Sequence, residues 1–111
     1  MDIEIKSWLY DIVNAIEEIN AFLANTPDLA AFQNDLKTRR AVERNIEIIG
    51  EAMSRLLNKD GSILLSNARK IVDTRNRIIH GYDTVSDEII WNITKHYIPV
   101  LKLEATQLLD Q

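Results

Sequence analysis

The sequence contains no cysteine, only two prolines and three glycines, and few aromatic residues. The lack of cysteine excludes disulfides, thiolate catalysis and cysteine-based zinc sites. Because proline and glycine are scarce, the composition favours a globular, mostly helical chain without flexible linkers. A chain of 111 residues has room for one hydrophobic core, so we expect a single domain over residues 1–111.

Long apolar runs are also missing, and the first residues, Met1–Glu4, lack the basic start and apolar stretch of a signal peptide. We therefore expect a cytoplasmic protein with no membrane contact. The two histidines have no evident carboxylate constellation beside them, so we expect neither a metal nor a cofactor.

Basic residues are outnumbered, and the net charge of −4 argues against nucleic acid as a partner. Their distribution argues the other way. Ten of the thirteen Lys and Arg residues lie between positions 37 and 77, with only five of the seventeen acids. This segment forms either ordinary solvated helix faces or a basic strip, and in the second case Arg40, Arg44 and Arg77 are candidate contacts for RNA phosphates.

Apolar residues recur every three or four positions along most of the chain, which predicts amphipathic helices. The first helix is expected from Ile5 to Leu23 and ends before Pro27, which lacks the donor that a continuing helix needs. A short turn at Leu29–Phe32 then leads into a second long helix over residues 35–57.

Residues 58–62 form a loop by composition. The apolar triplet Ile63–Leu65 is expected to form a helical turn, and Ser66 or Asn67 to cap a third helix. That helix should end at Gly81, because glycine accepts the left-handed conformation found just past helix ends.

Ser86 is expected to cap the last helix, and Pro99 to kink it without breaking it, since the apolar pattern resumes in register beyond the proline. Four long amphipathic helices with short connections predict an all-α antiparallel bundle of four to five helices. No repeat, low-complexity tract or hairpin pattern competes with this fold.

Residues 75–82, Arg-Asn-Arg-Ile-Ile-His-Gly-Tyr, bring together an arginine, an imidazole and a phenol at the end of the predicted third helix. Arg75 offers a planar fork of donors that suits a phosphodiester. His80 is the type of side chain that both takes and gives protons near neutral pH. The combination points to phosphate chemistry without a metal.

Helical spacing decides which of these side chains can meet. Asn76 and His80 share one face, and Arg77 and His80 are also neighbours. Arg75 and His80 diverge by about 140° around the helix. They can act together only if the arginine reaches around, if the helix end unwinds, or if a second subunit brings its own copy alongside. This geometry favours the third arrangement, a cleft shared across the two-fold axis of a homodimer.

The pattern Arg75-x4-His80-x-Tyr82, with Asn76 after the arginine, resembles the signature of HEPN-domain ribonucleases of the HepT toxin type. Three further features of the sequence agree with this family, and they are Gly50-Glu51-Ala52, the segment Ile89–Trp91, and Tyr97-Ile98-Pro99. The resemblance extends over nearly the whole chain, from about Ile5 to Leu109.

The resemblance implies a HEPN-like, homodimeric, metal-independent endoribonuclease that cleaves RNA by attack of the 2′-hydroxyl. Arg75 and His80 would be the catalytic pair and Asn76 an orienting residue. The family also implies a toxin paired with a minimal nucleotidyltransferase antitoxin, MntA, which silences it by adding AMP to Tyr82. A larger hetero-oligomer with that antitoxin is a further possibility.

Each of these residues also has a structural interpretation. His80 could be a core histidine or could cap a helix end. Arg75 and Arg77 could form ordinary surface or interface ion pairs with Asp73, Asp83 or Glu51. Tyr82 could be a half-buried aromatic. Glu51 could orient a catalytic side chain or make a structural hydrogen bond.

Three residues outside the motif, His96, Trp8 and Trp91, are expected to have packing roles. They lie on helix faces that should contact the core or a second subunit. Two rival functions stay open at this point. The chain could be a non-catalytic helical subunit that binds nucleotide or substrate for a nucleotidyltransferase, or a purely structural dimerisation bundle.

Overall fold

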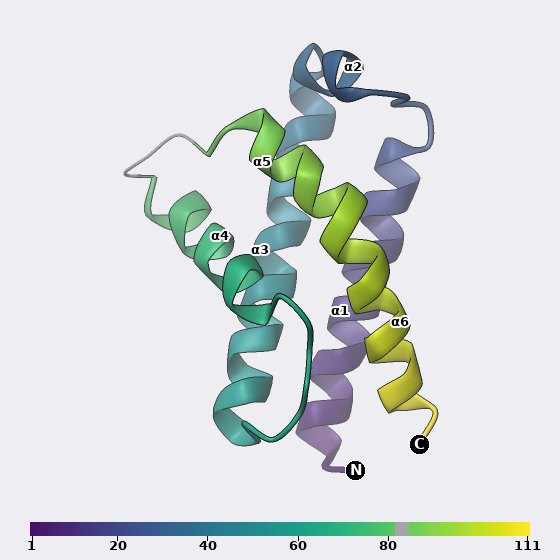
Figure 1. Ribbon diagram of the computed structural model, residues 1–111, viewed down its shortest axis with the longest axis vertical. Coiled ribbons are helices and arrows are strands. Elements are labelled where there is room, and N and C mark those ends of the chain that lie inside the picture. Colours follow the sequence, from purple (N-terminus) through teal and green to yellow (C-terminus); the bar gives the residue numbers. More distant parts are fainter. Residues whose placement is uncertain (82–84) are drawn as a thin grey trace.

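The computed structural model describes residues 1–81 and 85–111. Its α-helices are α1 (Ile3–Leu23), α2 (Leu29–Gln33), α3 (Leu36–Lys59), α4 (Ala68–His80), α5 (Asp87–Asn92) and α6 (Ile98–Leu109), and a π-helical turn, Ile93–Tyr97, joins α5 to α6. In Figure 1, α1, α3, α4 and the continuous α5–α6 rod alternate in direction. The expected all-α antiparallel bundle is confirmed for the described residues, which contain no strand.

The apolar stripes predicted from the sequence form the core. Helix α1 packs against both α3 and α6, and α3 also carries α4. The fully buried side chains of α1 and α3 include Leu9, Ile12, Ile16, Ile19, Val42, Ile46, Ile49, Met53 and Leu56. Since α3 contributes to the core with one face and supports α4 with another, it links the core to the motif at residues 75–82.

Several helix ends lie where the sequence placed them. Asp35 caps α3, because its carboxylate accepts bonds from the Thr38 hydroxyl at 2.7 Å and the Thr38 N–H at 3.1 Å. These bonds hold the pKa of Asp35 below the usual 3.8. Ser86 accepts a bond from Ile89 N–H at 3.2 Å, which starts α5. Gly81 ends α4 in a left-handed conformation with φ of 64°.

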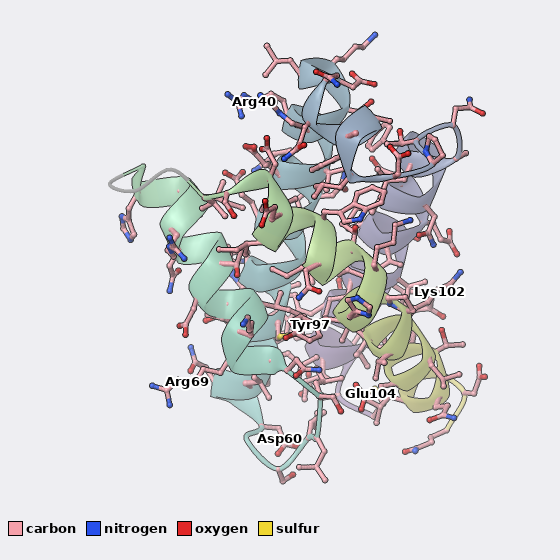
Figure 2. All side chains as sticks on the ribbon, turned by 45° about the horizontal axis from the view of Figure 1, so that its top comes forward. Arg40, Asp60, Arg69, Tyr97, Lys102 and Glu104 are labelled. Atoms are coloured by element: carbon pink, nitrogen blue, oxygen red, sulfur yellow. The ribbon has the colours of Figure 1, made fainter. Side chains whose placement is uncertain are left out.

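The expected helical turn at Ile63–Leu65 is wrong. This segment is a loop in which Leu65 is buried while Leu64 is 86% exposed, so only part of the triplet contacts the core. Ser66 does not cap α4 either. Its N–H and hydroxyl instead donate to the carboxylate of Glu104 on α6, at 2.9 and 2.7 Å, and Glu104 lies beside this loop in Figure 2.

Asn67 holds the N-cap position of α4 in a left-handed conformation and makes no side-chain cap bond. As expected, the last helix continues without a break through Pro99. The helix passes through a π-helical turn just before it, which accommodates the proline ring where a regular α-turn would clash. None of the helices in the described part of the chain is long and apolar enough to cross a membrane.

Replacing Phe32 with alanine is expected to lower the free energy of unfolding by about 3–5 kcal/mol. The Phe32 side chain is 1% exposed, and its ring lies 5.4 Å from that of Trp91, which ties α2 to α5. Urea unfolding followed by circular dichroism measures the change. The matched control is Phe22→Ala, because Phe22 is 40% exposed and its loss should cost no more than about 0.5 kcal/mol. Equal losses for the two variants would contradict this packing.

Candidate active site

Helix α4 carries the motif, and Arg75 is directed from it toward α3. One guanidinium nitrogen, Nη2, is paired with Glu51 of α3. The other, Nη1, donates to the side-chain oxygen of Asn76 at 2.8 Å. The structure therefore brings together three residues that the sequence singled out. Within one subunit, Arg75 forms the ion pair with Glu51 that was one of the structural alternatives.

Glu51 is shared between two arginines. Its second oxygen accepts a bond from Arg55 Nε at 2.9 Å, one turn further along α3. The Arg75 side chain is 24% exposed and that of Arg55 is 61% exposed. Because water screens exposed pairs, the contact of Glu51 with Arg75 is the better shielded of the two and fixes the direction of the Arg75 head group.

Close packing of the two helices brings Arg75 to this position. A Cβ atom at Gly50 would lie 2.4 Å from Cβ and 2.7 Å from Cγ of Arg75, closer than packed carbon atoms approach. The stem of Arg75 therefore occupies the space that the missing side chain leaves. The sequence showed Gly50 only as one of several matching residues, and nothing local in α3 reveals that a residue 25 positions later lies on it.

Arg75 opens into a groove of about 330 Å³ between α1, α3 and α4. The groove combines charges of both signs with apolar surface, and it is lined by Trp8, Asp11, Arg44, Glu47, Ile48, Glu51, Ala52, Arg55, Arg75 and Ile79. Trp8, Ile48 and Ile79 were not predicted to line a site. Of the predicted phosphate contacts only Arg44 lies here, and it is paired with Glu47 at 3.0 Å.

A second groove of about 370 Å³ lies on the other flank of α4 and holds the remaining predicted phosphate contacts, Arg40 and Arg77. Arg40 projects outward from the start of α3 in Figure 2 and is paired with Glu43 at 2.9 Å. Arg39 also lines this groove and contacts Asp87 at 3.4 Å. Arg40, Arg44 and Arg77, which the sequence suggested as parts of a basic strip, are thus divided between two grooves.

His80 is the last residue of α4 and is exposed. It lines neither groove. Because α4 stays helical as far as His80, five positions separate it from Arg75 by about 140° around the axis, and the alternative of an unwound helix end does not apply. Asn76 lies between the two, since it accepts a bond from Arg75 and shares a helix face with His80.

Of the remaining residues considered in the sequence, Trp91 and His96 line neither groove. The Trp91 ring packs against that of Phe32 with the two planes tilted by 39°, and Lys95 Nζ lies 4.4 Å from the centre of the Trp91 ring, which supports a packing role. His96 is exposed on the π-helical turn. Tyr82, the predicted modification site, lies outside the described residues.

Comparison with known proteins now adds to this geometry. The model of a family described as "Ribonuclease HepT-like" matches residues 12–108. The chain belongs to the HepT-like ribonuclease family. This match covers α3 and α4, the two helices that hold Arg75, Glu51 and His80.

Individual relatives of this HepT-like chain agree with the family match. A Methanocaldococcus jannaschii protein named "Putative RNase" is 35% identical over 92% of this chain and 94% of its own length. A Thermococcus cleftensis protein named "Probable ribonuclease HepT" is 37% identical over 87% of this chain and 88% of its own. No solved structure matches the chain.

Proposed function

We propose that this HepT-like chain is a metal-independent endoribonuclease whose active site is shared by two subunits. The observation that carries the proposal is the divergence of Arg75 and His80 on one unbroken helix, with Arg75 held toward α3 by Glu51. Each cleft then takes Arg75 from one subunit and His80 from the other. The family and the names of the relatives support RNA as the substrate.

The two side chains supply complementary chemistry. His80 takes the proton of a ribose 2′-hydroxyl, whose oxygen attacks the adjacent phosphorus while the bond to the 5′-oxygen breaks. The leaving oxygen gains a proton, and the products are a 2′,3′-cyclic phosphate and a free 5′-hydroxyl. Arg75 stabilises the negative charge that builds on the phosphate oxygens in the transition state. DNA has no 2′-hydroxyl and is therefore not a substrate.

The groove beside Arg75 has the features of a contact between two identical surfaces. It combines the apolar side chains of Trp8, Ile48 and Ile79 with charges of both signs. A surface that pairs with its own copy must be self-complementary in this way. Arg40 and Arg77, in the other groove, are then left to contact RNA phosphates beyond the cleft.

Replacing His80 with alanine is expected to lower the rate of RNA cleavage by about 10²- to 10⁴-fold, the usual contribution of a general acid or base. The assay uses labelled RNA in excess EDTA and resolves the cyclic phosphate product. His96→Ala is the matched control and should cleave at the wild-type rate, since His96 is exposed on another helix. A folded His80→Ala protein that remains fully active would eliminate His80 as a catalytic residue. A wild-type chain that cleaves no RNA would favour the non-catalytic subunit.

Mixing two inactive proteins tests the shared cleft. Arg75→Ala and His80→Ala subunits each lack one group in every cleft, but a mixed dimer has one cleft with both groups intact. Equal mixing with random pairing should restore about a quarter of the wild-type activity. If the mixture stays as inactive as its components while mixed dimers are present, each cleft draws both residues from a single subunit.

We propose further that the chain is a toxin silenced by a nucleotidyltransferase partner through AMP addition to Tyr82. The phenol oxygen attacks the α-phosphorus of ATP and pyrophosphate leaves. The product adds bulk and negative charge two positions after His80, where an RNA phosphate has to dock. Substrate is then excluded by both steric hindrance and charge repulsion.

Incubation with the partner and ATP should raise the intact mass of the chain by whole AMP units and abolish RNA cleavage. Tyr82→Phe should gain no mass and stay active, whereas Tyr10→Phe, at an exposed tyrosine of α1, should behave as wild type. Expression of Tyr82→Phe should also arrest growth even when the partner is present. Mass added to the Tyr82→Phe protein would assign the modification to a different residue.

A further inference from the structure

We infer that Gly50 is a positioning residue for RNA cleavage, because it admits the stem of Arg75 against α3. This inference rests on the proposed function, in which Arg75 acts on the scissile phosphate. Gly50 itself touches no substrate and acts only through Arg75.

The position of Gly50 in the fold calls for a packing reason. It is buried inside the 24-residue helix α3, where glycine is less favourable than alanine. A Cβ atom there would lie 2.4 Å from Cβ of Arg75, which requires α4 to move away. At Gly61, in contrast, an added Cβ would meet only a backbone oxygen of Leu57, at an ordinary 3.6 Å.

This contact determines where the guanidinium lies. With its stem against Gly50, Arg75 reaches the very next residue of α3, Glu51, and pairs with it. The Nε atom of Arg75 is buried and has no hydrogen-bond partner among the described residues. Packing of the stem on Gly50 and the ion pair with Glu51, rather than a hydrogen bond of Nε, therefore hold the side chain in place.

A displaced arginine affects turnover more than substrate binding. Stabilisation of the transition state depends on donors held where charge develops, and a misplacement of about 1 Å can cost about 100-fold in rate. RNA binding also draws on phosphate contacts elsewhere on the surface, such as Arg40 and Arg77. A methyl group at position 50 should thus lower kcat and leave KM nearly unchanged.

The test compares the wild type with Gly50→Ala, Arg75→Gly and the double variant. Because Cβ of Arg75 is the nearest atom, Gly50→Ala should lower Tm by about 5 °C or more when Arg75 is present. In the Arg75→Gly background the same change should leave Tm unchanged or raise it, since the obstacle is gone and alanine favours the helix. In the cleavage assay, Gly50→Ala should lower kcat about 10- to 100-fold. Gly61→Ala is the matched control and should keep the wild-type kcat.

The outcomes separate this inference from the proposed function. An equal loss of Tm in both backgrounds would show that the contact with Arg75 is not what glycine provides. Unchanged kcat in Gly50→Ala, with Arg75→Gly inactive, would overturn the positioning role and leave the proposed function intact. An active Arg75→Gly protein would overturn the proposed function itself.

If Gly50→Ala is too unstable to assay, Glu51→Gln tests whether the position of Arg75 matters for kcat. This substitution removes the charge that holds the Arg75 head group and leaves the helix packing in place. A fall in kcat at nearly constant KM is the expected result. A wild-type kcat in Glu51→Gln would show that the fixed position of Arg75 does not matter for turnover.

Discussion

The contact between α3 and α4 at Gly50 and Arg75 is the constraint on which the arrangement of the site depends. Helix α3 contributes one face to the core and supports α4 with another, so the motif helix is placed by the same element that organises the core. Arg75 takes part in both the packing of the helices and the polar contacts of the site. Its stem packs between α3 and α4, while its head group contacts Glu51 and Asn76. Helix packing and polar contacts are therefore joined in one side chain.

The ion pairs explain how an acidic protein can offer a surface to RNA. Arg40, Arg44 and Arg55 are each paired with a glutamate on the exposed surface of α3. Such pairs contribute little to stability, so a phosphate can replace the carboxylate at small cost. Because these carboxylates are replaceable, the net charge of −4 does not exclude binding of RNA, and the less exposed pair at Arg75 is better fixed.

Much of the fold could be predicted because periodic burial leaves a periodic pattern of apolar residues. The helix ends at Asp35, Gly81 and Ser86 were equally local and were found. The predictions that failed, the helical turn at Ile63–Leu65 and the Ser66 cap, concern a loop shaped by a long-range contact. Ser66 is hydrogen-bonded to Glu104, 38 positions away, and this contact decides the path of the loop before α4. In the candidate site, the spacing of Arg75 and His80 was visible in the sequence. The meeting of Arg75 with Gly50 and Glu51 was not, because it depends on how two helices pack.

The two tryptophans occupy contrasting environments, and this difference offers an optical signal. Trp91 packs against Phe32 and Lys95, whereas Trp8 lines the groove beside Arg75. A chain that carries phenylalanine in place of Trp91 would owe its tryptophan fluorescence to Trp8 alone. Entry of another molecule into that groove would then shift the emission spectrum, and association could be followed in real time without attaching a dye.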